Sequence, residues 1–235
     1  PDTKAVLLTH CETSTGTTTD VKSVAEVVQK YSNALVIVDG ISAIGALEFR
    51  FDEWGIDACV TASQKGLMIP PGLAFVAFSN RAEQSALVST LPKYYFDLKK
   101  SLFAYEKNDT PWTPAITLVR GLETSLQMIT AEGMGNVWKR HERISKILHE
   151  GLTGLGLKIF SKNPSFCVTA VFLPDGIAWD NFNSKLLNEH NLIIAPGQAE
   201  CFGKIFRIAH IGNIDDTNIN IILSALEKIL EKNAG

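Results

Sequence analysis

Four short apolar runs in the first third of the chain predict the strands of one buried sheet. The second run, Ala34 to Val38, is apolar without a break, as expected of a strand in a parallel sheet with helices on both faces. After Asp20, which is placed to cap a helix, apolar residues recur at helical spacing: Val21, Val24, Ala25, Val27 and Val28. The four predicted strands, at residues 4–10, 34–38, 57–62 and 73–78, are expected to share one core.

A long connection and a helical segment follow the fourth strand. Residues 93–114 are rich in aromatic and basic side chains and contain Asn, Asp and Pro near their end. A connection of this length inside a compact domain is usually functional or part of an interface. The pattern is then helical from residue 115 to about residue 152, with an interruption near Gly133 and Gly135.

This interruption marks the expected boundary between two domains. Residues 1–131 are predicted to form part of a larger domain, and residues 132–235 a smaller α/β domain. The smaller domain is expected to contain strands at residues 167–173, 192–195 and 205–209, and helices at residues 179–189 and 215–231. The fold class is therefore α/β.

Polar residues follow the predicted strands of the larger domain. Asp39 comes directly after the second strand and precedes the loop 40–45. A polar loop with Thr13 follows the first strand, and Lys65 lies in a loop after the third strand. Because ligands of open α/β sheets bind at the carboxyl ends of the strands, these residues are expected to surround one ligand.

Lys65 is the strongest single candidate for chemistry. A lysine in a partly desolvated pocket has a lowered pKa, and its free amine is a nucleophile toward carbonyl groups. The plain alternative, that Lys65 only lies at the top of a loop, is the commoner case for a lone lysine. For Asp39 the corresponding alternative is a turn after a strand. The presence of both residues at neighbouring strand ends favours a site.

Charge and hydropathy exclude some classes of partner. The chain has 235 residues, of which 46% are hydrophobic, and this is enough for one large or two modest domains with real cores. The formal net charge is −3 without a block of like charges, so neither nucleic acid nor an anionic membrane surface is an expected partner. No apolar stretch approaches the length of a membrane span.

The cysteines indicate the compartment. Cys11, Cys59, Cys167 and Cys201 are widely separated and form no Cys-x-x-Cys pair, and no histidine stands at metal-ligand spacing from them. This pattern predicts reduced thiols in a cytoplasmic protein and no structural metal.

Five short segments stand in a fixed order along the chain. They are His10-x-Glu12-Thr13-Ser14-Thr15-Gly16, Val38-Asp39-Gly40-Ile41-Ser42, Ser63-Gln64-Lys65, Pro70-Pro71-Gly72 and Phe206-Arg207-Ile208. Together these segments resemble class V aminotransferases, and the resemblance is nearest to the alanine–glyoxylate and serine–pyruvate aminotransferases. The interval of 26 residues between Asp39 and Lys65 is that of the family. Any one segment alone is weak evidence, but together they cover essentially the whole chain.

The resemblance implies the type I fold of the enzymes that use pyridoxal 5'-phosphate (PLP). In that fold a large domain with a mostly parallel sheet, of which this chain holds a part, is followed by a smaller α/β C-terminal domain. Lys65 matches the lysine that forms the Schiff base with PLP, and Asp39 matches the partner of the pyridine nitrogen. Physical chemistry agrees, because PLP accepts electrons well only with its ring nitrogen protonated, and a neighbouring carboxylate favours that charged form.

The same resemblance implies further contacts with the cofactor. Thr13 matches the hydroxyl residue that bonds the phenolic oxygen, Gln64 matches a phosphate ligand, and Ile41 matches the apolar residue against one face of the ring. Thr110 and Thr113 match positions from which a neighbouring subunit reaches the phosphate, which implies a homodimer with composite sites. For each threonine and for Gln64, ordinary hydrogen bonding within a loop is the alternative.

Arg207 matches the arginine that binds the α-carboxylate of the substrate through two parallel hydrogen bonds. It lies inside the apolar segment 205–209, where an arginine is costly unless it is paired. The sequence does not identify the amino donor, because alanine, serine and aspartate present the same α-carboxylate.

The chain departs from the family at its start. Family members have a further upstream segment with the first strands of the sheet, the helix N-terminus that holds most of the phosphate, and the aromatic residue stacked on the ring. The present chain begins with Pro1 rather than Met and enters a predicted strand almost at once. We therefore expect it to be part of a longer enzyme.

The expected function is transamination from a small amino acid, of the alanine or serine class, to a 2-oxo acid such as glyoxylate or pyruvate. Lys65 would be both the nucleophile toward PLP and the general base. One alternative is a catalytically inactive paralogue that acts as an interaction subunit, and the retention of Asp39, Lys65 and Arg207 argues against it.

A cysteine desulfurase, with Cys201 as its nucleophile, is a second alternative. Gln64 stands where desulfurases typically have histidine, and Cys201 is expected just before a strand rather than on a long loop. Both features argue against this activity.

None of the five histidines is assigned a catalytic role. His10 ends the first predicted strand and is placed to orient a neighbouring residue. The other four are interpreted as surface or helix-face residues: His141, His149, His190 and His210.

Overall fold

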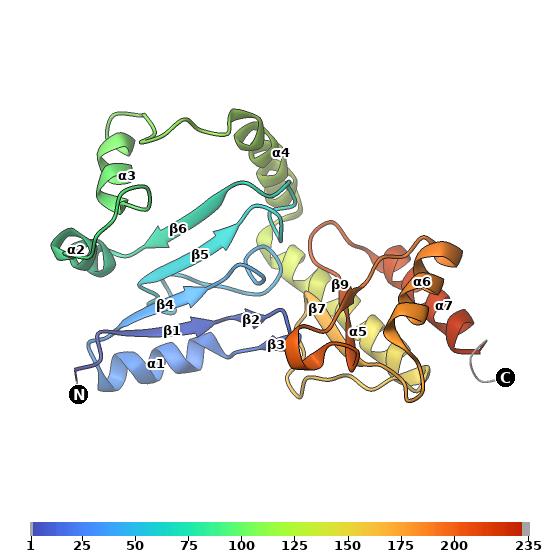
Figure 1. Cartoon of the computed structure of the whole chain (residues 1–235). Coiled ribbons are helices and arrows are strands. Elements are labelled where there is room, and N and C mark those ends of the chain that lie inside the picture. Colours follow the sequence, from blue (N-terminus) through green and yellow to red (C-terminus); the bar gives the residue numbers. More distant parts are fainter. Residues whose placement is uncertain (1, 232–235) are drawn as a thin grey trace.

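The computed structural model describes residues 2–231 and contains two larger sheets, one in each half of the molecule (Figure 1). The larger sheet has the strand order β1-β4-β5-β6. Strands β1 (Ala5–Thr9), β4 (Leu35–Asp39) and β5 (Ala58–Ala62) are parallel, and β6 (Ala74–Phe78) is antiparallel to β5. The prediction of a mostly parallel sheet is therefore confirmed.

Helix α1 (Val21–Tyr31) covers one face of this sheet. The carboxylate of Asp20 accepts the N–H of Ser23 at 3.0 Å, so Asp20 caps the helix as predicted. The helix and the sheet share a buried apolar cluster made of Val21, Ala25, Val36, Val38, Ile56 and Cys59. This cluster holds β4 and β5 in place, and the predicted site residues follow these two strands.

A small hairpin, absent from the sequence prediction, follows β1. Its strands β2 (Cys11–Glu12) and β3 (Thr17–Thr18) are antiparallel and only two residues long, too short to give an alternating pattern. The hairpin docks on the second sheet, because Gly16 accepts the N–H of Ser165 at 2.9 Å. Gly16 has φ +63°, and a Cβ there would lie 2.9 Å from the backbone nitrogen of Ala170.

The segment between the two sheets is more helical than predicted. Helix α2 (Asn80–Val88) precedes the predicted connection 93–114, and α3 (Leu98–Tyr105) lies inside it. Asp97 caps α3 by accepting the N–H of Lys99 at 3.0 Å, so the prediction of a long connection without a helix was wrong. Helices α4 (Ile116–Glu132) and α5 (Met134–Gly154) follow.

The predicted interruption of the helical segment is confirmed at Gly133, which has φ +83° between α4 and α5. The predicted boundary between residues 131 and 132 falls at the last turn of α4. The division into two domains stays a prediction, and its end residues Pro1 and 232–235 lie outside the described part of the chain.

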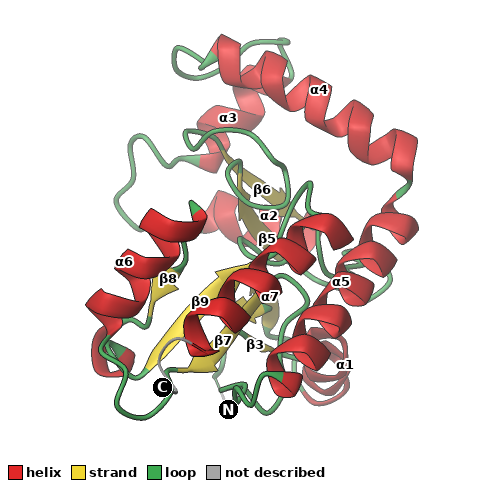
Figure 2. Ribbon diagram, turned by 90° about the vertical axis from the view of Figure 1, so that its right-hand side faces the viewer, coloured by secondary structure: helices red, strands yellow, loops and turns green. Residues whose placement is uncertain are grey.

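The second sheet has the order β7-β9-β8 and is antiparallel throughout. Figure 2 shows helix α7 in front of β7 and β9, with α6 to the left and α5 to the right. Buried apolar residues of these helices and strands form one cluster, which includes Ile144, Phe182, Phe206 and Leu226. The elements are β7 (Val168–Phe172), α6 (Trp179–His190), β8 (Ala195–Pro196), the 3-10 helix η1 (Ala199–Cys201), β9 (Ile205–Ala209) and α7 (Asp216–Glu231).

The predicted strand 192–195 was wrong for most of its length, because only Ala195 belongs to β8. Asn191 adopts a left-handed conformation with φ +52° at the end of α6. The N–H of Leu192 then bonds the carbonyl of Leu186 at 3.0 Å. This left-handed cap ends helix α6 in the region where a strand was expected.

No helix within residues 2–231 is both long enough and apolar enough to cross a membrane.

Candidate active site

Asp39 is the last residue of β4 and pairs in register with Thr9 of β1 and Val60 of β5. Its carboxylate accepts the backbone N–H of Ile41 at 2.9 Å, which fixes the side chain in a tight turn. Burial, followed by the negative charge of Asp39, raises the pKa of the Cys59 thiol to about 11. The carboxyl edge of the sheet therefore carries a fixed, half-buried carboxylate.

The loop after β5 holds Lys65 in an ordered conformation. The hydroxyl of the buried Ser63 donates to the carbonyl of Pro70 at 2.8 Å and accepts the N–H of Leu73 at 3.2 Å. Within this closed loop, Met68 donates its N–H to the carbonyl of Lys65 at 2.9 Å. Lys65 is half-buried. Its backbone is thus held from both ends of the loop.

The loops after β4 and β5 are in direct backbone contact. A Cβ added to Gly66 would overlap the carbonyl oxygen of Ile44 and lie 2.8 Å from the Cα of Gly45. Gly45 has φ +86°, so it too requires the conformational freedom of glycine. These two glycines bring the loop that begins at Asp39 against the loop that carries Lys65.

Thr13 lies between β2 and β3 and joins the same edge through Ser42. The two hydroxyl oxygens are 2.5 Å apart, and the carbonyl of Ser42 accepts the thiol of Cys167 at 2.8 Å. Ser42 belongs to one of the segments that resemble the family, but no role is predicted for it from the sequence. A hydroxyl residue in an otherwise apolar loop was the only sequence signal that could have singled out Ser42. Its partner Thr13 lies 29 positions away, so the contact is evident only in the fold.

Arg207 reaches this edge from β9 of the second sheet. Its Nε donates to the carbonyl of Pro196 at 2.9 Å, and its Nη1 donates to the carbonyl of Thr13 at 3.0 Å. Burial lowers the pKa of Arg207, and the negative charge of Glu12 opposes this effect. Both hydrogen-bond acceptors of Arg207 in the described part of the protein are neutral carbonyls. A guanidinium has five N–H donors, so three have no hydrogen bond among residues 2–231.

The other predicted site residues are less well connected. Ile41 is half-buried beside Asp39, and Gln64 is exposed next to Lys65. Thr110 and Thr113 are exposed in the segment between α3 and α4. The hydroxyl of Thr110 donates to the carbonyl of Trp112 at 2.8 Å, a contact within its own segment. The fold therefore gathers Thr13, Asp39, Lys65 and Arg207 more closely than the two later threonines.

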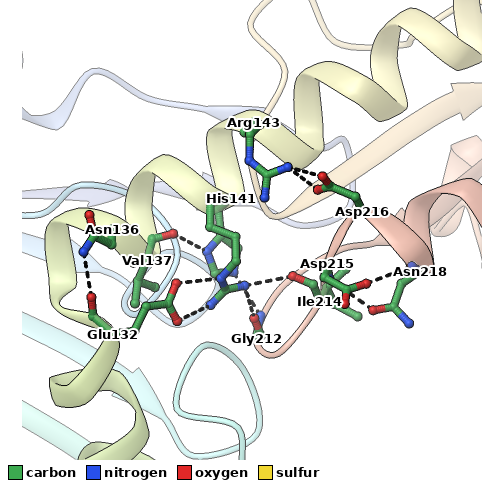
Figure 3. Close-up of polar contacts among 11 residues, drawn as sticks. Glu132, Asn136, Val137, His141, Arg143, Gly212, Ile214, Asp215, Asp216 and Asn218 are labelled. Atoms are coloured by element: carbon green, nitrogen blue, oxygen red, sulfur yellow. Dashed lines mark hydrogen bonds and ion pairs between the residues drawn. The ribbon is translucent and has the colours of Figure 1, made fainter.

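The interpretation of the later histidines as surface or helix-face residues was wrong for His210, which follows β9 and has no exposed surface. His141 lies in helix α5 and is fully buried as well. Burial lowers the pKa of His210 to about 3, and its Nε2 lies 2.8 Å from the hydroxyl of Thr169. His141 donates from Nδ1 to the carbonyl of Val137 at 2.8 Å and accepts the N–H of Gly212 at Nε2, at 3.1 Å (Figure 3). These two bonds require neutral His141, and burial lowers its pKa accordingly.

The same region supports the Lys65 loop. Arg140 pairs with Glu132 at 2.7 Å and donates to the carbonyls of Gly212 and Ile214, each at 2.9 Å, so α5 holds the loop that precedes α7. A Cβ on Gly212 would lie 3.2 Å from the Cγ of Met68 in the Lys65 loop. The clamped loop therefore packs against the lysine loop.

A protein-family model described as aminotransferase class V matches residues 1–211. The chain belongs to the class V aminotransferase family.

Similar proteins carry several functional names. The L-aspartate–glyoxylate aminotransferase of Paracoccus denitrificans is 39% identical over 217 residues, which are 91% of this chain and 55% of that protein. The small subunit of the soluble hydrogenase of a Synechococcus species is 39% identical over 229 residues, 97% of this chain and 59% of that protein. This class V aminotransferase chain thus spans less than two thirds of both relatives.

Among solved structures, the ureidoglycine–glyoxylate aminotransferase of Bacillus subtilis superposes with a TM-score of 0.91 at 30% identity. The match covers 99% of this chain and 61% of that structure. The predicted fold, that of the PLP-dependent aminotransferases, is confirmed.

The groups at the edge of this class V aminotransferase sheet fit the chemistry of PLP. The fixed carboxylate of Asp39 suits a protonated pyridine nitrogen, and the amine of Lys65 suits the carbonyl carbon of the cofactor. The hydroxyl of Thr13 suits the phenolic oxygen. These groups come from three adjacent loops that contact one another, so one ligand can meet all three.

Proposed function

We propose that the full-length protein is a PLP-dependent aminotransferase that moves an amino group from a small amino acid to a 2-oxo acid. The observation that carries the proposal is the backbone contact between the Asp39 loop and the Lys65 loop, in a chain of the class V family. Glyoxylate is the acceptor named for both the Paracoccus relative and the Bacillus structure, while their donors differ. We therefore propose glyoxylate as an acceptor, with pyruvate as a second candidate.

In this proposal each residue that binds the cofactor contacts one particular part of it. When bound, PLP supplies an electron sink that stabilises negative charge at the substrate Cα. Asp39 holds the proton on the pyridine nitrogen, and Thr13 donates its hydroxyl to the phenolic oxygen. Ile41 contacts one face of the ring, and Gln64 binds the phosphate.

Lys65 and Arg207 act on the substrate. Lys65 would hold the cofactor through its amine, and the free amine of Lys65 would remove the proton from the substrate Cα. Arg207 binds the α-carboxylate with N–H groups that its bonds to Pro196 and Thr13 leave available. The carbonyl of Thr13 thus orients the guanidinium toward the cofactor side of the site.

We further propose a cytoplasmic homodimer in which Thr110 and Thr113 bind the cofactor phosphate of the partner subunit. Large apolar side chains are exposed beside these threonines, including Tyr94 at 70% and Phe96 at 89%. Four free cysteines agree with a reducing compartment. The division at residues 131 and 132 is proposed as the boundary between the cofactor domain and a small domain that carries Arg207.

Amino-group transfer by the PLP-loaded full-length protein tests the proposal. Serine and aspartate are each supplied with glyoxylate or pyruvate, alanine is supplied with glyoxylate only, and the formation of glycine or alanine is measured. We expect glycine to form from glyoxylate with at least one donor. Absence of transfer in every combination, from protein that binds PLP and is folded, would overturn the proposed activity and favour an interaction subunit.

A further inference from the structure

Two cysteines from different parts of the fold lie side by side near the candidate active site. Cys11 lies in β2, and Cys167 lies directly before β7, 156 positions later in the chain. Their sulfur atoms are 3.4 Å apart, and the side chains are buried, with 3% and 1% of their surface exposed. A disulfide bond is about 2 Å long, so the sulfurs need to approach by about 1.4 Å.

The backbone keeps the two thiols together. On the hairpin side, Thr18 donates its N–H to Asn163 at 3.0 Å, and Gly16 accepts the N–H of Ser165 at 2.9 Å. The carbonyl of Cys167 accepts the N–H of His210 at 3.0 Å. Hydrogen bonds therefore hold the segments of both cysteines against their neighbours, so the two sulfurs stay close together.

The polar surroundings make the two thiols unequal. The hydroxyl of Ser165 lies 3.2 Å from the sulfur of Cys11 and 3.0 Å from that of Cys167. The side-chain interaction with Cys167 is the largest cause that lowers the pKa of Cys11, and the charge of Lys65 also lowers it. The same interaction raises the pKa of Cys167. Cys11 is therefore the thiol that ionises first, and a thiolate is the form that reacts with oxidants.

We propose that Cys11 and Cys167 form a modification site at which a small peroxide makes a disulfide. The thiolate of Cys11 attacks one oxygen of hydrogen peroxide, the O–O bond breaks, hydroxide leaves, and Cys11 becomes a sulfenic acid. The sulfur of Cys167 then attacks the sulfur of Cys11, the S–O bond breaks, and water leaves with the proton of Cys167. In total two thiols lose two electrons, and one peroxide is reduced to two waters.

This bond would connect the hairpin that holds Thr13 to the second sheet. It would also remove the S–H group that Cys167 donates to the carbonyl of Ser42 at 2.8 Å. Cys59 and Cys201 are also free thiols, but neither has a sulfur partner among residues 2–231. Within one chain, peroxide at those positions can produce only the single-cysteine oxidation products.

Peptide mapping of the full-length, PLP-loaded protein tests the site without reference to activity. The protein is treated with hydrogen peroxide, its remaining thiols are alkylated, and it is digested without reductant. We expect one linked pair of peptides, containing Cys11 and Cys167 and lighter by two hydrogen atoms than their sum. Dithiothreitol should remove this product. Cys59→Ser and Cys201→Ser serve as matched controls and should keep it.

Two variants test the order of the steps. Cys11→Ser should lose the linked pair completely. Cys167→Ser should lose it as well, but its Cys11 should now accumulate as a sulfenic acid that dimedone labels. The peptide map of the wild-type protein alone shows which cysteines are linked. The pairing can therefore be tested even if a variant fails to fold.

The proposal is overturned if a peroxide dose that oxidises Cys201 leaves Cys11 and Cys167 as free thiols, which are alkylated once the treated protein is unfolded. It is equally overturned if the link joins other cysteines, or if dimedone labels no Cys11 in a folded Cys167→Ser protein.

Discussion

At the scale of single residues, the account depends on charged groups that neutral backbone groups hold in place. The N–H of Ile41 fixes the carboxylate of Asp39, and the carbonyls of Pro196 and Thr13 fix the guanidinium of Arg207. Each arrangement leaves part of the charged group available for a ligand, because a carboxylate accepts about four hydrogen bonds and a guanidinium donates five.

Asp39→Asn tests the charge at the end of β4. Asparagine keeps an oxygen acceptor for the N–H of Ile41 but cannot hold a proton on the pyridine nitrogen. The turnover number should fall by orders of magnitude, each tenfold loss corresponding to about 1.4 kcal/mol of barrier, while the KM of each substrate changes far less. Steady-state kinetics with matched PLP content measure this. Turnover near that of the wild type would show that the charge has no role.

Arg207→Lys tests the carboxylate site. Lysine keeps the positive charge but loses the planar fork, and it cannot bond Pro196, Thr13 and a carboxylate at once. The kcat/KM of every amino acid and oxo acid should fall by a similar factor. This factor corresponds to a loss of about 1.5 to 3 kcal/mol in transition-state stabilisation. The control is an amine without a carboxylate, whose slow reaction should be unchanged. An equal loss for this amine would assign Arg207 to the fold rather than to the substrate.

The sequence predicted the position of Asp39, Lys65 and Thr13 in the fold better than it predicted their contacts. Asp39, Lys65 and Thr13 follow apolar runs, so their place at the carboxyl edge could be predicted from local patterning. The bond between Thr13 and Ser42 and the pair Cys11 and Cys167 join distant segments. Such contacts depend on how the hairpin docks, which no local pattern encodes.

At the scale of elements, two loops in backbone contact bring the site together, and glycine makes this contact possible. Helices α1, α5 and α7 were predicted because each has a buried apolar face. Helix α2 was missed because none of its residues is buried, and α3 buries only Ala104. An apolar period can reveal an element only where it packs on a core.

Gly66→Ala should separate the two loops. Its Cβ would overlap the carbonyl of Ile44, and backbone cannot move aside as a flexible side chain can. We expect a loss of about 1 to 3 kcal/mol in the free energy of unfolding, the usual range for overpacking, together with weaker PLP binding. Gly135→Ala is the matched control, because nothing lies within 4 Å of its added Cβ and its helix α5 favours alanine. Equal behaviour of both variants in denaturant titrations would contradict the loop contact.

At the scale of the whole molecule, buried neutral histidines link the fold to pH. Burial lowers the pKa of His10 to about 4 and that of His210 to about 3, and it also lowers the pKa of His141. A protonated His141 would place two donors face to face at the N–H of Gly212. Protonation of these histidines at low pH should therefore destabilise both halves of the molecule.

The full-length protein should lose stability as the pH falls below about 6.5. The unfolded chain binds protons on these histidines near pH 6.5, whereas the folded chain excludes them until about pH 4 or 3. The stabilisation is complete above pH 6.5 and declines below it by about 1.4 kcal/mol per pH unit for each histidine. Denaturant titrations from pH 7.5 to 4.5 measure the slope. His10→Gln should reduce the slope, and a flat profile would exclude the linkage.

The central claim is that Lys65 is the lysine that holds the cofactor, and borohydride reduction of the full-length protein with PLP tests it most directly. Reduction makes a link between a lysine and PLP permanent, so peptide mapping then identifies the labelled residue. We expect the label on Lys65 alone. Lys65→Ala should remain folded, because a half-buried loop side chain is lost without opening a core cavity, and should bind PLP without a permanent link. A label on any other lysine, or none on Lys65 in PLP-loaded protein, would contradict the account.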